Sequence, residues 1–199
     1  CRIFTQFSDG RELQQEPQET QAAGGVQWPG GMDGTIVCFD AAENVHREGI
    51  LRTSTVPANV SSQTGAAARA AAERLLIGLD YVGVLGLELF IARDGRLIAN
   101  EFAPRVHNSG HWTMDACAVS QFEQHMRAVC GWPLGHPRRH SDAVMTNLIG
   151  DEVNEWERLA TEPDTSVHLY GKAEARPGRK MGHATRLYTL GKRPPVTPS

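Results

Sequence analysis

Two apolar runs and the turn between them decide the fold: Val82-Gly83-Val84-Leu85-Gly86-Leu87-Glu88-Leu89-Phe90-Ile91-Ala92, then Arg93-Asp94-Gly95, then Arg96-Leu97-Ile98-Ala99-Asn100-Glu101-Phe102. An Asp-Gly pair between apolar runs is the strongest short-range signal for a β-hairpin. If Asp94 and Gly95 form a two-residue loop, Glu88 lies directly opposite Glu101. Both faces of this hairpin are apolar, so we expect it at the centre of a sheet.

The same register predicts the neighbours of the two carboxylates. It pairs Phe90 with Ala99 and Ala92 with Leu97, on the face that carries Glu88. Strict alternation points Asn100 away from Glu101, so an irregular strand is needed to bring its side chain to the same place.

Two like charges directly opposed in a half-buried sheet destabilise it, so Glu88 and Glu101 need a compensating partner. Hard divalent cations take carboxylate oxygens and commonly bridge to substrate phosphates. Both glutamates, with Asn100, are therefore a candidate Mg²⁺-nucleotide site. Two alternatives stay open: one glutamate pairs with an arginine such as Arg105, or a bulge shifts the register.

Composition bounds the class of protein. The chain has 199 residues, a formal net charge of −3 and 40% hydrophobic residues, which is enough for a real core and argues against a generally basic nucleic-acid binder. It has no apolar run of the roughly 18 residues that span a bilayer, and no signal pattern at its start. Four widely spaced cysteines indicate reduced thiols. We expect a cytoplasmic protein with no nucleic-acid or membrane partner.

Elements outside the hairpin follow from local patterns. Strands are expected at 35–39, 50–54, 143–149 and 167–170, and helices at 62–78, 121–130 and 153–159. Residues 1–31 are glutamine-rich and show no sustained period, so no structure is predicted there. The proline-rich tail at 193–199 is expected to be loose.

A donor-rich loop follows Glu101 directly. It contains Arg105, His107, Asn108 and Ser109, and loops at strand ends often carry ligand chemistry; a polar surface turn is the plain alternative. The four-residue spacing of His107 and His111 is compatible with zinc, but the sequence between them disfavours a helix.

A basic segment lies near the carboxyl end. Residues 172–193 carry a net charge of +6, with glycines between the cations, which suits a phosphate group. A solvated basic face is the alternative. RNA binding is less favoured, because only Tyr170 and Tyr188 lie nearby as stacking platforms.

Together these elements resemble a known family. The segments that carry the likeness are Glu43 to Arg52, Asn100-Glu101-Phe102-Ala103-Pro104-Arg105-Val106-His107-Asn108-Ser109-Gly110-His111-Trp112, Tyr170-Gly171-Lys172, and Arg176-Pro177-Gly178-Arg179-Lys180-Met181-Gly182-His183. They are similar to 5-(carboxyamino)imidazole ribonucleotide synthase, an ATP-grasp ligase of purine synthesis in bacteria and fungi, over residues 33 to 190.

The resemblance implies a reaction and a set of roles. ATP phosphorylates bicarbonate to carboxyphosphate, which delivers CO₂ to the amine of 5-aminoimidazole ribonucleotide. By this likeness Glu88 and Glu101 hold Mg²⁺ (or Mn²⁺), and Asn100, Glu101 and His46 contact the nucleotide. The carboxyphosphate pocket is formed by Arg105, His107, Asn108 and Ser109. The ribonucleotide phosphate is bound by Lys172, Arg176, Arg179 and Lys180.

The implied fold is α+β: the second half of an ATP-grasp module with a small β-rich C-terminal domain. The expected division is a poorly ordered, unmatched lead-in at 1–32, a partial ATP-grasp domain at 33–140, a small β-rich domain at 141–190 and a tail at 191–199. A homodimer is expected of the full-length enzyme.

Parts of the family pattern are missing from this sequence. The Gly-rich loop, the phosphate lysines and the acidic hinge are not found, so we expect a carboxyl-terminal part whose first stretch is mis-translated, misassembled or replaced, with little turnover alone. Two other functions stay open: a catalytically inert fragment acting as a dimerisation or structural module, and another ATP-grasp carboxylase.

Overall fold

The structure is a computed structural model that describes residues 2–9, 35–92 and 94–193; side chains are described for the last two ranges. The strands are β1 (Arg2–Asp9), β2 (Ile36–Cys38), β3 (Ala42–Arg47), β4 (Ile50–Val56), β5 (Gly83–Ile91), β6 (Leu97–Ala103), β7 (Asp142–Ile149), β8 (Thr165–Leu169) and β9 (Lys180–Tyr188). The helices are α1 (Ser62–Leu79), α2 (Thr113–Ala116), α3 (Gln121–Val129) and α4 (Trp156–Ala160), with 3₁₀ turns η1 (Asn108–Gly110) and η2 (Gly150–Glu155).

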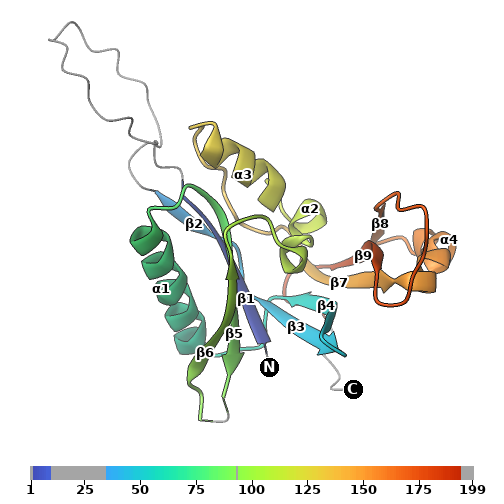
Figure 1. The fold of residues 1–199 in the computed structure, drawn as a ribbon, viewed down its shortest axis with the longest axis horizontal. Helices are drawn as coiled ribbons and strands as arrows, with labels where there is room; N and C mark the ends of the chain where they lie inside the picture. The colour runs from blue at the N-terminus through green and yellow to red at the C-terminus, as the bar shows by residue number, and fades with distance from the viewer. Residues whose placement is uncertain (1, 10–34, 93, 194–199) are drawn as a thin grey trace, which may run out of the picture.

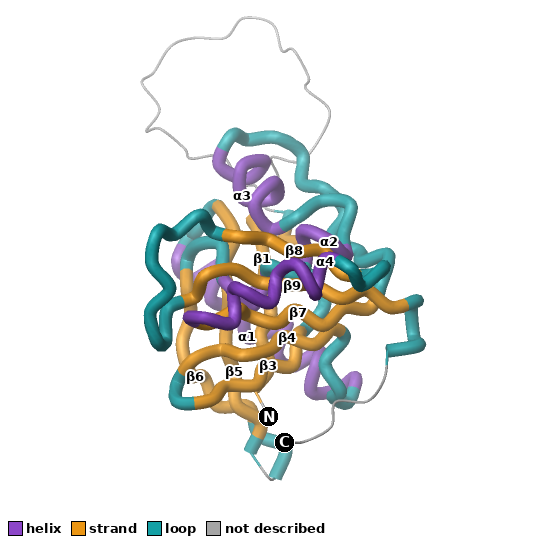
Figure 2. Tube along the Cα trace, turned by 90° about the vertical axis from the view of Figure 1, so that its right-hand side faces the viewer, coloured by secondary structure: helices purple, strands orange, loops and turns teal. Residues whose placement is uncertain are grey.

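The described strands form one antiparallel sheet in the order β6-β5-β1-β3-β4-β7-β9-β8, with β2 paired to β1 (Figures 1 and 2). The α+β class is confirmed. The β-rich carboxyl-terminal part continues the same sheet, because β7 pairs with β4 through Thr53↔Thr146 to Val56↔Ala143. The division into domains stays a prediction.

The hairpin forms with one change to its turn. The loop has three residues: the Ala92 nitrogen donates to the Arg96 carbonyl (2.9 Å), and Gly95 has a φ of 83°. A three-residue loop with a left-handed glycine is a common hairpin form. The predicted pairs Phe90 with Ala99 and Ala92 with Leu97 are therefore wrong, and Phe90 pairs with Ile98 instead.

A β-bulge at Asn100 corrects this one-residue shift. Leu89 pairs with Ala99 and Glu88 pairs with Glu101, so Asn100 is the extra residue on β6. The two carboxylates consequently lie opposite each other as predicted, and the irregularity needed at Asn100 is present.

Three other expectations need correction. The hairpin is not central: β6 is the edge strand of the described sheet, because β1 pairs with the other side of β5.

The second correction concerns the amino end, where the sequence predicts no structure. β1 lies there between β5 and β3, and eight residues of β1 pair with β5. Its sequence Ile3-Phe4-Thr5-Gln6-Phe7 is β-branched and aromatic, a strand signal outweighed by the glutamine-rich stretch that follows. Residues 10–34 lie outside the described residues.

The third correction concerns the basic segment. The sequence predicts no strand within the basic segment 172–193, yet residues 180–188 form β9, which pairs with β7 on one side and β8 on the other. Residues 181–185 are buried without alternation, so this part of β9 lacks the two-residue period of a half-buried strand, and charged residues flank it in the sequence. β3 was not predicted either, since polar residues occupy much of it.

Helix α1 packs on one face of the β5–β6 hairpin (Figure 1). Small residues Ala68 and Ala72 let it approach closely, and Leu76 packs with Leu85, Leu87 and Leu89 of β5. The Ser61 hydroxyl caps its start by accepting from the Thr64 nitrogen at 3.0 Å. This packing leaves the opposite face of β5, which carries Glu88, for chemistry.

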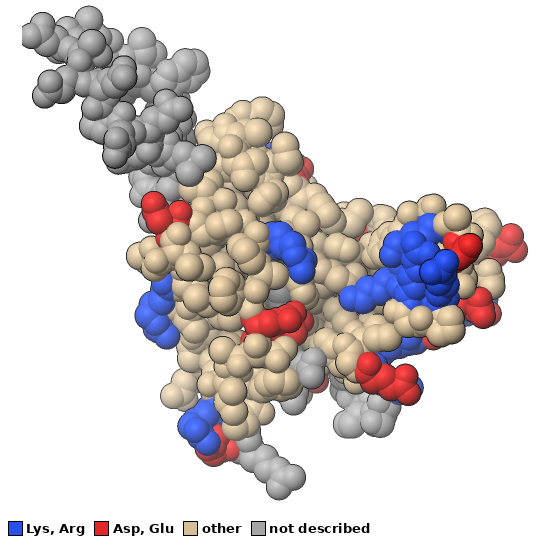
Figure 3. All heavy atoms as spheres, viewed as in Figure 1, with Lys and Arg blue, Asp and Glu red and all other residues tan. Residues whose placement is uncertain are grey.

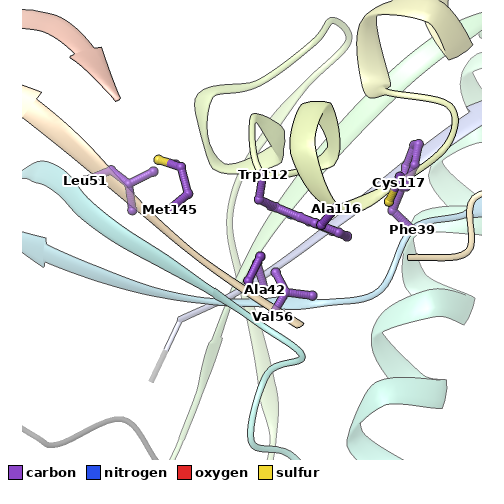
Figure 4. Close-up of a cluster of buried hydrophobic side chains, with 9 residues drawn as sticks. Phe39, Ala42, Leu51, Val56, Trp112, Ala116, Cys117 and Met145 are labelled. Atoms are coloured by element: carbon purple, nitrogen blue, oxygen red, sulfur yellow. The ribbon is translucent and has the colours of Figure 1, made fainter. Parts of the chain in front are cut away.

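A second buried cluster joins the loop after β6 to the middle of the sheet (Figure 4). Trp112 and Ala116 pack against Phe39, Ala42, Leu51, Val56, Cys117, Ala143 and Met145. The Trp112 and Phe39 rings meet edge to face with centroids 6.3 Å apart. The donor-rich loop at 105–112 is thereby anchored at its carboxyl end.

We expect Leu76→Ala to lower the free energy of unfolding by about 2–5 kcal/mol, because it removes a fully buried side chain and leaves a cavity between α1 and β5. Urea denaturation measures the effect. Ile77→Ala is the matched control, since Ile77 is the next residue of the helix and is 60% exposed. Equal losses in the two variants would contradict the packing described.

Candidate active site

The paired carboxylates lie at the bulge of the hairpin. Glu88 is buried at 4% exposure, and the Asn100 side-chain amide donates to its Oε2 at 3.2 Å. The Glu101 side chain, opposite Glu88, is 60% exposed. One carboxylate is therefore held in place while the other reaches the surface.

His107 completes this cluster. Ligand atoms of Glu88, Glu101 and His107 all lie within 4.8 Å of one another, and His107 Nε2 is 3.7 Å from Glu101 Oε1. The Ser109 backbone nitrogen donates to His107 Nδ1, so the hydrogen-bond pattern assigns the proton of the neutral ring to Nε2. His107 thus directs an N–H toward the carboxylates.

The electrostatic surroundings keep His107 neutral. Burial is the largest cause, and the charges of Arg105 and Lys180 add to it, lowering the pKa of His107 to about 4. Near neutral pH the ring is therefore a neutral hydrogen-bond donor.

Gln121 holds the loop in this shape. Its Oε1 accepts a hydrogen bond from the backbone nitrogen of His107 (2.9 Å). Its Nε2 donates to the backbone carbonyl of His107 (2.9 Å) and contacts His111 Nδ1 (2.7 Å). The side chain is fully buried, so these bonds satisfy an amide that would be costly to bury alone. The first residue of α3 thereby fixes the backbone of the donor loop.

Asn108 and Ser109 are held by hydrogen bonds to other side chains. The Asn108 and Asn147 amides exchange hydrogen bonds at 3.0 and 2.7 Å, and Asn147 also donates to the Leu51 carbonyl at 3.0 Å. Ser109 is fully buried, with its hydroxyl 2.7 Å from His107 Nδ1. These side chains order the loop from β4 and β7.

Lys180 connects the basic segment to the carboxylates. It is half-buried at the start of β9, and burial lowers its pKa while the nearby charge of Glu88 raises it; the charges of Lys172, Arg105 and Glu101 also act on it. The Lys172 ammonium donates to the Lys180 carbonyl at 2.6 Å. The two predicted halves of the site therefore meet at Lys180.

The remaining predicted residues are more loosely placed. Arg105 is exposed and donates to the Val106 carbonyl at 3.0 Å. Arg176 pairs with Glu174, and Arg179 donates to the Glu174 carbonyl at 3.2 Å. His46, on β3, is near enough for its charge to act on His107. Basic side chains gather on the β8–β9 end of the face shown in Figure 3.

A second group of polar side chains was missed by the sequence analysis. His168 and His183 form a directly opposed pair of β8 and β9, and their rings stack with centroids 4.6 Å apart. His168 bonds Asp115 at 3.0 Å, and this bond raises the pKa of His168. Burial lowers the pKa of His183 to about 3 and raises that of Tyr170 to about 12.

Little in the sequence could have found these supporting residues. Asn147 stands within the apolar run Ala143 to Ile149, and a lone amide in a buried strand indicates a specific partner. Gln121 follows the capping residue Ser120 and looks like any first-turn residue. Only the folded chain brings it to His107.

Comparison with known protein families matches the chain in two adjacent parts. The ATP-grasp domain model matches residues 30–122, and the phosphoribosylaminoimidazole carboxylase C-terminal domain model matches residues 143–189. N5-carboxyaminoimidazole ribonucleotide synthase of Brucella melitensis is 65% identical over 154 residues, 77% of this chain and 42% of that protein. The chain belongs to this synthase family.

Other members of the family match the same part of the chain in sequence and in structure. The Escherichia coli synthase is 46% identical over 77% of this chain and 42% of its own length. The crystal structure of the Thermus thermophilus synthetase superposes with a TM-score of 0.77 at 37% identity, over 94% of this chain and 45% of that one. An Aspergillus clavatus synthase in complex with ADP and 5-aminoimidazole ribonucleotide has a TM-score of 0.78 at 28% identity, over 94% and 46%. The chain thus spans about two-fifths of the curated relatives quoted.

We expect His107 and His111 to remain neutral down to about pH 5, since the pKa of each is lowered to about 4, mainly by burial. The unfolded chain binds protons at these rings below about pH 6.5, so their contribution to stability is present at neutral pH and decreases as the pH falls from about 6.5 toward 4. Imidazole resonances in an NMR titration, assigned with His107→Gln, measure this. His168, whose pKa is raised, is the internal control. A His107 midpoint near 6.5 would contradict the buried geometry.

Proposed function

We propose that this chain supplies the metal-binding and product-side part of the active site for ATP-dependent carboxylation of 5-aminoimidazole ribonucleotide with bicarbonate, a step of purine biosynthesis. The observation that carries the proposal is the opposed pair Glu88 and Glu101 with His107, within 4.8 Å at their ligand atoms. Relatives at 46–65% identity bear the name of this synthase. The activity belongs to a whole enzyme, of which this chain spans a part.

The donor set fits a hard divalent cation. Two carboxylates supply oxygen ligands, and the Asn100 amide already bonds Glu88 Oε2. When bound, Mg²⁺ or Mn²⁺ would neutralise charge on the phosphates of ATP. Glu88 and Glu101 would hold it, and the bulge fixes their separation.

The donor loop suits the carboxyphosphate side of the reaction. Phosphoryl transfer depends on positioned donors that face the developing charge. The Nε2–H of His107 and the Arg105 guanidinium are donors of this kind, while Asn108 and Ser109 hold the loop. Because His107 is neutral, it donates a hydrogen bond without becoming a second cation beside Lys180.

The basic segment suits the phosphate of the ribonucleotide. Lys172, Arg176 and Arg179 are exposed on the loop between β8 and β9, and the charges of Glu88 and Glu101 act on Lys180. Guanidinium groups bind phosphate oxygens in pairs. The amine acceptor would thereby be held next to the site where the carboxyl group is activated.

The setting of the enzyme is part of the proposal. We infer a cytoplasmic homodimer that uses small-molecule substrates, with no nucleic-acid or membrane partner. None of the helices in the described ranges combines the length and apolar character needed to cross a bilayer.

We expect Mn²⁺ to bind the chain at the carboxylate pair, and Glu101→Gln to weaken this binding at least about tenfold, because one of two anionic ligands is lost. Loss of the free-ion electron paramagnetic resonance signal measures binding. Asp94→Asn is the matched control, since Asp94 is an exposed acid of the same hairpin that pairs with Arg96. Unchanged binding by Glu101→Gln would refute the metal site.

We expect 5-aminoimidazole ribonucleotide to raise the melting temperature of the chain, and Arg179→Ala to remove most of the shift, because bound ligand stabilises only the folded state. Differential scanning fluorimetry measures the shift. Arg138→Ala is the control, as Arg138 is an exposed arginine outside the basic loop. Equal shifts in both variants would place the phosphate elsewhere.

A further inference from the structure

A second cluster of metal-ligating side chains lies apart from the paired carboxylates. Ligand atoms of Asp115, His168 and His183 all lie within 4.8 Å of one another. They come from three elements: Asp115 from α2, and the two histidines from a directly opposed pair of β8 and β9. The cluster is therefore assembled by tertiary structure alone.

One nitrogen in this cluster lacks a partner. His183 is 1% exposed, and its Nε2 has no hydrogen-bond partner among the described residues. Its other nitrogen, Nδ1, lies 2.9 Å from the Tyr170 hydroxyl. Burying an unpaired polar atom costs free energy, so a native structure that retains one calls for an explanation.

Asp115 and His168 are the other two candidate ligands of the cluster. His168 Nε2 lies 3.0 and 3.1 Å from the two oxygens of Asp115, and the His168 ring stacks on His183 at an interplanar angle of 18°. A hydrogen-bonded histidine and carboxylate, placed beside a buried imidazole with a vacant nitrogen, form a mixed nitrogen and oxygen donor set.

We propose that Asp115, His168 and His183 form a binding site for a borderline-soft divalent cation of the Zn²⁺ class, separate from the Glu88–Glu101 site. Two imidazoles and one carboxylate are ligands that Zn²⁺ takes at about 2.0–2.2 Å, with a fourth position for water. The lone pairs of the stacked rings lie in nearly parallel planes, so one ring turns out of the stack as the cation replaces the proton shared by His168 and Asp115.

The surroundings suit such a site. A ligating histidine usually bonds a neighbour through its other ring nitrogen, which fixes the ring, and Tyr170 occupies that place for His183. Bound metal would link α2, which follows the donor loop directly, to β8 and β9, which flank the basic loop. It would therefore fix the two walls of the active site relative to each other.

The two sites differ in ligand chemistry, so binding to one can be measured apart from binding to the other by the choice of metal ion. The hairpin pair is rich in carboxylate oxygen and suits Mg²⁺ or Mn²⁺, whereas imidazole nitrogen favours Zn²⁺ and Co²⁺. Exposed Cys130 and the Cys1 thiol could bind the same ions, so the experiment uses the full chain with both replaced by serine.

Co²⁺ titration followed by visible absorption tests the proposal. We expect one site with d–d bands typical of nitrogen and oxygen ligands, and a rise in melting temperature with Zn²⁺ that equal Mg²⁺ does not give. His168→Asn should weaken binding at least about tenfold, and Tyr170→Phe about 10–100-fold. Zn²⁺ binding should release a proton, seen as a buffer-dependent heat.

Two control variants test whether the Co²⁺ signal comes from this cluster. His140→Asn, at an exposed histidine, and Glu101→Gln should both retain Co²⁺ binding. His183→Gln replaces a buried side chain, so it is informative only if the variant folds. The His168 side chain is 29% exposed, so His168→Asn disturbs the fold less and is the deciding variant if His183→Gln does not fold. Absent Co²⁺ binding, or binding that His168→Asn leaves unchanged, would overturn the proposal.

Discussion

Two like charges held at one point of the β5–β6 hairpin govern the arrangement of the polar groups around them. Glu88 and Glu101 are opposed across β5 and β6, an arrangement that costs free energy without a compensating charge or donor. The bulge turns the Asn100 amide onto Glu88, and the loop that follows brings His107 to Glu101. The two opposed carboxylates therefore lie within a polar network that includes Asn100 and His107.

The rest of the fold serves to hold that centre. Helix α1 covers one face of the hairpin with Ala68, Ala72 and Leu76, so the opposite face is available for polar groups. Trp112 anchors the donor loop in the second core, and Gln121 and Asn147 bind its backbone and side chains. Both amides are fully buried, where the low dielectric strengthens each bond and makes an unpaired group costly. A loop fixed in this way presents donors in one geometry.

Continuity of the sheet brings the carboxyl-terminal strands to the site. β7 extends the sheet from β4, and β9 beside it starts at Lys180, whose charge interacts with both glutamates. Residues 79 and 92 positions apart in the sequence are thus combined by strand pairing. The same pairing stacks His168 on His183, whose buried Nε2 has no hydrogen-bond partner among the described residues, so one sheet carries two polar clusters of different ligand character.

Local patterns were enough to predict the hairpin and the helices α1 and α3, because turn chemistry, capping and periodicity act over a few residues. The opposition of Glu88 and Glu101 was predicted from a two-residue loop, and it is retained because the three-residue loop and the bulge at Asn100 compensate each other. The family likeness was also carried by contiguous motifs. The folded chain was needed to show that β6 is an edge, that β1 belongs to the sheet and that residues 180–188 form β9. It was also needed to identify Gln121, Asn147 and His183 as supporting residues. These depend on pairing between distant segments, and the free energy of such contacts is set by burial that no local pattern encodes.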